Sequence, residues 1–365
     1  MERKRPRAEF CAIIRSTMKT TTLLALLLLP FTMIQAQPAA APAGEVIGVG
    51  NFLHIVADAE RALTFYHDVL GMDLPPVPVG APPVVVPRPY LTTPEIQNLY
   101  DAAGTPYRVT QAMIAESPMR DENVEWNVEG RKPIRPRLQD PGAGVMVMHV
   151  RDLDAIMARV KQAKATIVTS GGQPVASEGP NGKSRSVVLQ DPDGFFVELI
   201  QPDVLPASSA QASNNIYDIG FAATVDNLDR MVEVFKAMGF EPRVGEWTKD
   251  KARARIAGVA SGTRMRRATA LVPGTSFEVT LTEFRIAGKQ HLQSRVRDPG
   301  TSMLRLRVRD MDSILARAKA VGLVVASKDG QPVTVMGANG GQRIAILDGP
   351  DNLKIQFVQA IPKPN

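Results

Sequence analysis

The apolar and polar positions of the chain follow one order four times after residue 47. Each repeat begins with an apolar strand, continues with a helix whose apolar positions are three and four residues apart, and ends with short alternating strands. Glycines at Gly71 and Gly239 occupy the position after a helix that glycine favours. The pattern predicts an α+β fold of four strand–helix–strand–strand–strand modules. The helices are expected at residues 59–70, 153–163, 228–238 and 311–320.

The second and fourth modules repeat each other at a constant offset of 158 residues, as the Asp-Pro-Gly motifs beginning at Asp140 and Asp298 show. Such a repeat indicates duplicated architecture, so equivalent positions can be compared within one molecule. Two pairs of equivalent positions differ in their capacity to bind a metal: His149 against Arg307, and Glu198 against Gln356. The sequence therefore predicts that one half could hold a metal and that the other could not.

The N-terminus has the pattern of a secretory signal. Lys19 precedes an apolar run at residues 23–31, which is followed by the small and polar residues 35–37. The run is too short to span a bilayer. Residues 1–36 are therefore predicted to be a signal peptide, with Met18 as an alternative start, and residues 37–46 a flexible segment. We expect a secreted or periplasmic protein with no stable membrane span after signal removal.

Composition places the chain among ordinary globular proteins. Its 365 residues suggest about two domains, and 44% hydrophobic with 22% charged residues is typical of a folded protein. Residues 1–36 contribute +4 of the formal net charge of +6, so a nucleic-acid-binding role has little support. The single cysteine, Cys11, also lies in this segment, which excludes a disulfide framework or a cysteine metal site in the remainder.

A polar segment of small residues at 204–213 is typical of a linker. It predicts two domains, residues 47–203 and residues 214–365, with two modules each. Module one also carries a proline- and valine-rich insertion at residues 75–100, which is expected to be a loop over one face.

Three stretches resemble the vicinal oxygen chelate superfamily of glyoxalase I, bleomycin-resistance-type proteins and extradiol dioxygenases. They are Phe52-Leu-His-Ile-Val-Ala-Asp, Ala62-Leu-Thr-Phe-Tyr-His-Asp-Val-Leu-Gly-Met and Asp191-Pro-Asp-Gly-Phe-Phe-Val-Glu-Leu. The resemblance implies that the four βαβββ modules pair into two tandem glyoxalase-like domains with cupped mixed sheets. It also implies that a metal lies in a cup, bound by residues of the first and last strand of each module.

Carried over residue by residue, the resemblance implies a metal site formed by His54, His149 and Glu198, with Glu122 as the fourth ligand. Imidazole and carboxylate suit a divalent ion such as Zn, Ni, Mn, Co or Fe(II), and the identity stays open. Such a set leaves positions free for substrate or water.

The fourth ligand has two alternatives, Glu125 on the same strand and Gln111 on the preceding strand. In the second domain, the three positions of His54, His149 and Glu198 correspond to Ala222, Arg307 and Gln356, so that domain is expected to lack the metal.

The resemblance favours a metal-dependent enzyme of the glyoxalase or epimerase type, a lyase or isomerase. Its small-molecule substrate would have vicinal oxygens, the ion would stabilise an enediolate, and Glu198 or Glu122 would move the proton. An Fe(II) extradiol-type dioxygenase on His54, His149 and Glu198 is one alternative. A non-catalytic secreted small-molecule-binding protein is the other. No nucleic-acid partner is expected, and a homodimer is an open prediction.

Overall fold

The computed structural model describes residues 45–77, 80, 84–113, 119–179, 182–207, 214–337 and 340–363. The predicted signal peptide (1–36), most of the segment 37–46 and part of the linker 204–213 lie outside the described residues. Everything below concerns the compact unit of residues 41–365. Within the described ranges, no helix is long and apolar enough to cross a membrane.

The chain forms four modules in the predicted order. Module one contains β1 (Val46–Val56), α1 (Ala59–Thr64) with its π-helical continuation η1 (Phe65–Val69), α2 (Pro94–Leu99), β2 (Tyr107–Met113) and β3 (Arg120–Trp126). Module two contains β4 (Gly144–Val150), α3 (Leu153–Gln162), β5 (Thr166–Ile167), β6 (Val175–Gly179), β7 (Gly182–Gln190) and β8 (Phe196–Pro202).

Modules three and four follow the same plan. Module three contains β9 (Ile216–Val225), α4 (Leu228–Ala237), β10 (Arg243–Val244), α5 (Lys251–Ile256), β11 (Arg264–Leu271) and β12 (Glu278–Arg285). Module four contains β13 (Ser302–Val308), α6 (Met311–Ala320), β14 (Val324–Val325), β15 (Val333–Gly337), β16 (Gly340–Asp348), the 3-10 turn η3 (Pro350–Asn352) and β17 (Lys354–Ile361). The α+β class, the four modules and their four leading helices are confirmed.

Each leading helix begins at a side chain that accepts a hydrogen bond from a free backbone N–H, as helix N-termini require. The four N-caps are Asp58, Asp152, Asn227 and Asp310. The apolar stripe that follows each cap is buried against a sheet, which explains why the three- and four-residue spacing located these helices correctly.

The sheets do not join neighbouring modules. One sheet has the order β14-β16-β17-β13-β1-β3-β2 and joins modules four and one, whereas the other has the order β10-β11-β12-β9-β4-β8-β7-β5 and joins modules three and two. The expectation that residues 47–203 and residues 214–365 each form their own cupped sheet is therefore wrong. The first strands of modules two and four, β4 and β13, are equivalent, so the local pattern does not decide which of them pairs with β1. The linker position at 204–213 stays a prediction.

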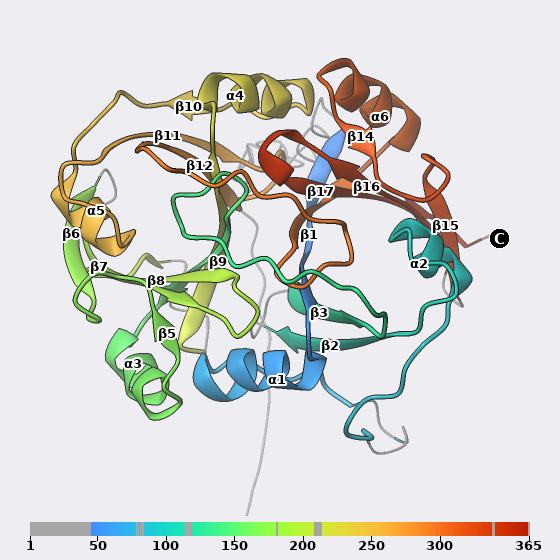
Figure 1. Ribbon diagram of the computed structural model, residues 1–365, viewed down its shortest axis with the longest axis horizontal. Helices are drawn as coiled ribbons and strands as arrows, with labels where there is room; N and C mark the ends of the chain where they lie inside the picture. Colours follow the sequence, from blue (N-terminus) through green and yellow to red (C-terminus); the bar gives the residue numbers. More distant parts are fainter. Residues whose placement is uncertain are drawn as a thin grey trace, which may run out of the picture. The chain divides into compact units, whose positions relative to one another are not determined.

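Two long connectors exchange the chain between the sheets, residues 127–143 after β3 and residues 286–301 after β12. They cross the centre of Figure 1 side by side, and Ile134 N–H donates to Pro299 O over 2.9 Å. Arg137 binds Asp140 at 2.6 Å and so belongs to this structural contact. The basic connector of module one therefore serves the crossover.

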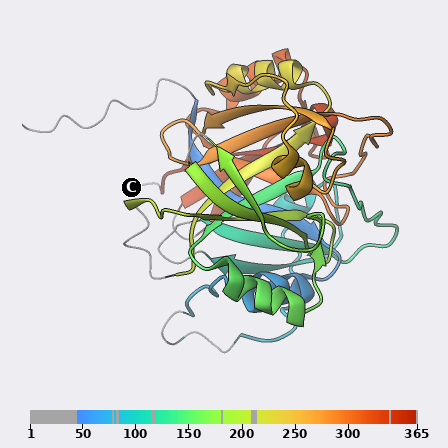
Figure 2. The ribbon, with the colours of Figure 1, turned by 90° about the vertical axis from the view of Figure 1, so that its left-hand side faces the viewer.

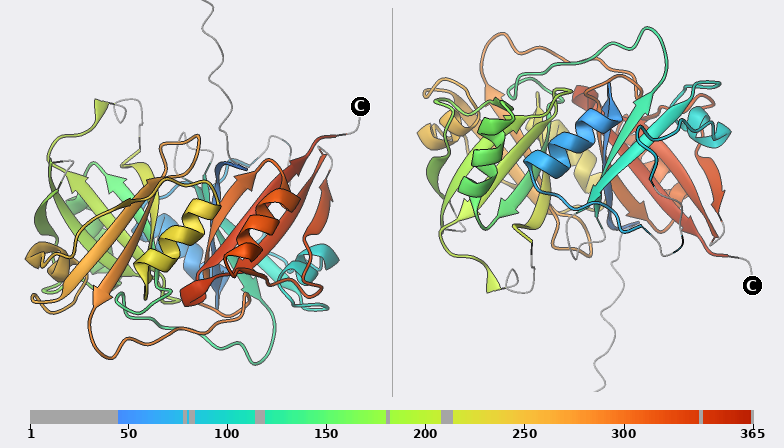
Figure 3. Two further views of the ribbon diagram at one scale, coloured as in Figure 1. Left: turned by 90° about the horizontal axis from the view of Figure 1, so that it is seen from above. Right: turned by 90° about the horizontal axis from the view of Figure 1, so that it is seen from below.

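The two sheets share one core and open in opposite directions. Buried residues of α1, α3, α4 and α6 and of one face of each sheet form a continuous apolar cluster. Figure 3 shows α4 and α6 over the strands on one side of the molecule and α1 and α3 on the opposite side, and Figure 2 looks onto the sheet of modules two and three. We call the opposite faces, away from these four helices, the outer cup (modules one and four) and the inner cup (modules two and three).

The predicted loop at residues 75–100 ends in a helix. α2 and the following Tyr100 pack into the outer cup, where Leu99 and Tyr100 are buried against Trp126. Module three has its own insertion, α5, whose Ala254 and Ile256 line the inner cup. Both cups are thus partly closed by a short helix from the same module position.

Candidate ligand site

His54 lies on the helix-covered face of β1 and not in a cup. Its side chain is 1% exposed, and its Nε2 lies 2.8 Å from Asp121 Oδ1. Its ring centroid is 3.9 Å from that of Phe195, inside the shared core. The neighbouring Leu53 and Ile55 face the outer cup instead. His54 is therefore a buried core residue and contributes no ligand to either cup.

The strand register explains this difference. Leu53 lies opposite Glu122 on β3, and Ala222 lies opposite Thr280 on β12. Ala222 is therefore the structural counterpart of Leu53, which precedes His54 by one residue. Because side chains alternate between the faces of a strand, a slip of one residue moves a side chain to the opposite face.

In the outer cup, Glu122 is neutralised by an arginine. It accepts hydrogen bonds from Arg305 Nη1 at 2.9 Å and from Asn51 Nδ2 at 2.5 Å, and Arg305 Nε also donates to the amide oxygen of Gln356. Burial raises the pKa of Glu122, but the charge of Arg305 and these hydrogen bonds outweigh it, so the pKa lies below its ordinary value. Glu122 is thus a paired carboxylate.

The outer cup is also filled. A Cβ on Gly50 would lie 2.6 Å from Arg305 Cδ, so glycine at this position makes room for the arginine side chain. The rest of the space is occupied by large rings: Tyr100 and Tyr107 lie with their centroids 5.1 and 5.0 Å from that of Trp126. The outer cup is therefore closed by aromatic packing and an ion pair.

The inner cup contains a small pocket with a cavity volume of about 60 Å³ that opens to solvent. Glu198 lies in it and accepts a hydrogen bond from Arg253 Nη1 at 2.5 Å. The charge of Glu198 raises the pKa of Arg253. The apolar wall comprises Leu138, Val145, Ala222, Ile256, Met265 and Phe284. This combination of an apolar wall and a few polar groups is typical of a small-molecule site.

Arg267 also lines this pocket, from β11. Its guanidinium has no hydrogen bond or ion pair with the part of the chain that the structure describes. Burial and the neighbouring charge of Arg253 lower the pKa of Arg267 to about 10, although Glu198 and Glu278 oppose this. The side chain is still protonated at neutral pH, so the pocket contains two arginines for one fully engaged carboxylate.

His149 belongs to the same cup as Glu198 but lies further along the sheet. Val147 pairs with Glu198 across β4 and β8, and His149 follows two residues later on the same face, about 7 Å away. Its neighbour on β9 is Asp218. Burial raises the pKa of Asp218, and His149 opposes this effect. His149 and Glu198 thus share a cup, but they do not converge on one point.

The four predicted ligands do not fit one metal ion. His54 is in the core, Glu122 is in the outer cup, and His149 and Glu198 are in the inner cup. In the described part of the chain, no group of three His, Cys, Asp or Glu side chains is placed to hold a metal. The outer cup offers only Glu122, which is paired with an arginine, and in the inner cup His149 and the arginine-paired Glu198 do not converge, so both are poor donor sets for a divalent ion.

The two alternative ligands have structural contacts of their own. Glu125 lies on the helix-covered face, where it accepts hydrogen bonds from Ala59 N at 2.8 Å and Arg108 Nε at 2.7 Å. It therefore stabilises the first turn of α1. Gln111 accepts a hydrogen bond from Arg120 Nη1 at 2.8 Å on the outer-cup side.

Sequence reasoning missed the arginines of the cups. The 158-residue offset also relates modules one and three, where Val109 corresponds to Arg267 and Glu122 to Thr280. The comparison of equivalent positions that singled out the histidines could also have found this exchange. Relative to module one, module three gains an arginine on β11 and loses a carboxylate on β12.

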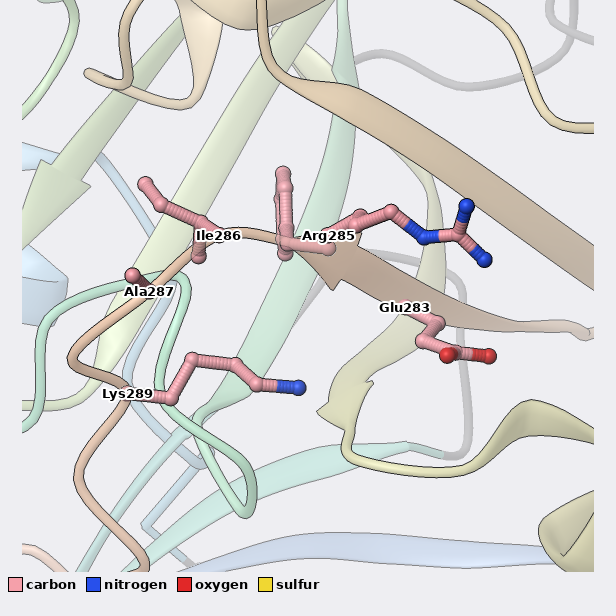
Figure 4. Close-up of a pocket in the computed structure, with 6 residues that line it drawn as sticks. Glu283, Arg285, Ile286, Ala287 and Lys289 are labelled. Atoms are coloured by element: carbon pink, nitrogen blue, oxygen red, sulfur yellow. The ribbon is translucent and has the colours of Figure 1, made fainter.

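A second hollow lies at the end of β12, where it is lined by residues 283–287 and Lys289 (Figure 4). Its charged groups are already engaged. Glu283 accepts a hydrogen bond from Leu228 N at 3.0 Å and one from Arg266 at 3.1 Å, and Lys289 binds Asp226. This hollow is a shallow groove between structural contacts and makes a poor ligand site.

The fold defines a protein of four βαβββ modules that pair into two cupped sheets. Residues 48–199 match the model of the Glyoxalase/Bleomycin resistance protein/Dioxygenase superfamily, so this part of the chain belongs to that superfamily. The resemblance of the three sequence stretches is confirmed.

Solved structures extend the similarity to most of the chain. Glyoxalase I from Zea mays is 16% identical, with a TM-score of 0.53 over 85% of this chain and 92% of that chain. A candidate dioxygenase from Bacillus subtilis is 14% identical, with a TM-score of 0.50 over 88% and 87%. At these identities the similarity shows the fold alone. Among curated proteins no match is found.

Proposed function

We propose that this chain is a metal-independent small-molecule-binding member of the superfamily, with its ligand site in the inner cup. The observation that carries the proposal is the contrast between an open pocket beside Glu198 and a filled outer cup. The non-catalytic binding protein, one of the alternatives from the sequence, thus takes precedence. Both the lyase or isomerase and the Fe(II) dioxygenase need histidine and carboxylate donors at one point, and these donors lie in separate places.

The leader supports a further part of the proposal. A signal peptide at residues 1–36 would deliver the binding protein to the periplasm or the exterior, where it would meet small molecules from outside the cell. This location, and a homodimer, remain proposals based on the sequence.

The test uses an environment-sensitive probe, 1-anilinonaphthalene-8-sulfonate, whose fluorescence increases in apolar pockets. We expect saturable binding that is abolished by Ala222→Leu, because this change gives the inner cup the leucine that the outer cup has at Leu53. The matched control is Ala287→Leu, which fills the groove of Figure 4 and leaves the inner cup intact. Equal binding by both variants and the parent protein would contradict the inner-cup site.

Metal content tests the other half of the proposal. We expect well below one ion per chain after incubation with Zn, Ni, Mn or Fe(II) and removal of the excess. About one tightly bound ion per chain, lost in Glu198→Gln or His149→Ala, would restore the metalloenzyme interpretation.

A further inference from the structure

We propose that Arg267 is an anion-binding residue and that the inner cup takes a small monocarboxylate with an apolar body. This inference rests on the proposed function, since it names the class of ligand for the same pocket. Four observations support it: the charge balance of the cup, the unpaired position of Arg267, the exchange relative to the outer cup and the chemistry of the walls.

The charge balance leaves one cation over. Arg253 is engaged by Glu198 at 2.5 Å. Of the other acids near the pocket, Asp250 caps α5 by accepting a hydrogen bond from Arg253 N at 3.0 Å, and Glu278 is exposed and accepts one from Thr280 Oγ1 at 3.1 Å. No acid of the described residues is paired with Arg267, although Glu198, Glu278 and Asp250 lie near enough to favour its charge.

A half-buried guanidinium without an acidic partner is less favourable than a paired one. The lowered pKa of Arg267 has the same origin, since burial and Arg253 both disfavour its charge. Such a position is expected where a ligand supplies the missing charge, because a carboxylate can accept two parallel N–H bonds from one guanidinium.

The outer cup has different side chains at the positions that are equivalent to Arg267 and Thr280. There, the position of Arg267 is Val109, and the carboxylate Glu122 balances Arg305 at 2.9 Å. In the inner cup, Thr280 replaces that carboxylate while Arg267 is added. A third exchange goes the other way, since Arg120 of the outer cup corresponds to Glu278, so the cups differ in the position of their charges and not in their sum.

The walls define the rest of the ligand. Around Arg267, the pocket has the hydroxyl of Thr282 and an apolar surface that includes Met265 and Phe284, while the hydroxyl of Thr280 already donates to Glu278. Hydroxyls can hydrogen-bond a carboxylate, while the apolar surface favours a hydrocarbon or aromatic body. One unpaired cation matches a monoanion.

Calorimetric titration of the full-length protein with benzoate and with its neutral isostere benzamide tests the inference. We expect benzoate to bind at least about tenfold more tightly, since a charged hydrogen-bond pair exceeds a neutral one. In Arg267→Met, this preference should disappear while benzamide binding is retained. The matched control is Arg264→Met, which removes an arginine from the opposite face of the same strand.

The outcomes separate the two proposals. Equal binding of benzoate and benzamide to the parent protein would overturn the carboxylate assignment and leave the inner-cup site standing. Unchanged benzoate preference in Arg267→Met would overturn the role of Arg267. If neither compound binds, and the fluorescent probe does not bind either, the proposed function itself fails. Competition by inorganic phosphate as strong as that by benzoate would overturn the monocarboxylate class.

Discussion

The outer and inner cups have the same scaffold, but they differ in how their charged side chains are paired and in whether the cup is filled. In the outer cup, Glu122 is paired with Arg305 and large rings fill the remainder. In the inner cup, Glu198 is paired with Arg253, Arg267 is left over, and a pocket remains open. One copy of a duplicated fold has become a packed support while the other has kept an accessible site.

The two cups also share one electrostatic arrangement, a carboxylate paired with an arginine. Each cup has kept one acidic side chain on a last strand of a module, Glu122 on β3 and Glu198 on β8. A buried carboxylate needs a counter-charge, and each cup supplies an arginine. The arginines come from different elements, Arg305 from β13 and Arg253 from α5, so the carboxylate of each cup is paired from a different part of the fold.

The largest expected effect is the loss of the outer ion pair. Arg305→Met should lower the free energy of unfolding by about 3 kcal/mol, because Glu122 would stay buried without its counter-charge. Arg253→Met should cost less, about 1 kcal/mol, because Arg267 can partly neutralise Glu198. Urea unfolding followed by circular dichroism measures both. Equal losses would contradict the idea that Arg267 compensates for the loss of Arg253.

A second large effect is expected at the core residue His54. His54→Ala should destabilise the protein by about 3 kcal/mol, since it opens a cavity beside Phe195 and removes the partner of Asp121 Oδ1, while Asp121 Oδ2 keeps its hydrogen bond from Asn123. Benzoate binding to the folded variant should be unchanged, as measured by titration. His149→Ala is the control, a partly exposed histidine for which little destabilisation is expected. If His54→Ala lost benzoate binding without losing stability, His54 would belong to the ligand site and not to the core.

The fold could be predicted from the sequence where one face of an element is polar. The stripes of Leu153, Ile156, Met157 and Val160 located α3 to within one residue of its end. In β1, by contrast, residues 52–56 are all buried, because the cup and the core are both apolar there. Alternation then gives no signal for the face of His54.

The partner of β1 was also beyond the sequence pattern. β4 and β13 are equivalent strands of a repeat, and the choice between them depends on the path of the connectors, which the local sequence does not encode. Glu198 was placed correctly on a cup-facing position because its strand follows the Asp-Pro-Asp-Gly turn. Arg253 entered the site from α5, an insertion without a counterpart in modules two and four.

The core beneath the cups is asymmetric too, and its pH response can show this. Asp191 is buried beside His54, and the equivalent position in module four is Gly349. Burial raises the pKa of Asp191 to about 6, against an opposing effect of His54. The folded protein therefore holds this proton more tightly than the unfolded chain. Its stabilising contribution is complete below pH 3.8 and is lost as the pH rises through about 6.

Asp191→Asn should remove this dependence while keeping an oxygen that accepts the hydrogen bonds from Asp193 N and Phe195 N. Relative to the parent protein, the variant should gain on the order of 2 kcal/mol between pH 4 and pH 7. Denaturant unfolding at several pH values measures the difference. A constant difference across this range would show that Asp191 titrates normally.

The smallest expected effect bears most directly on the contrast between the cups. Arg267→Met removes an unpaired, partly buried charge and places an apolar side chain where the outer cup has Val109. We expect the ligand-free protein to gain about 1 kcal/mol in the free energy of unfolding, or about 2 °C in Tm, because the variant no longer has to bury part of an unpaired guanidinium. Val109→Met in the outer cup is the control and should destabilise by overpacking. A clear loss of stability in Arg267→Met would mean that the arginine supports the fold, as Arg305 does, and the two cups would then differ in packing and not in charge.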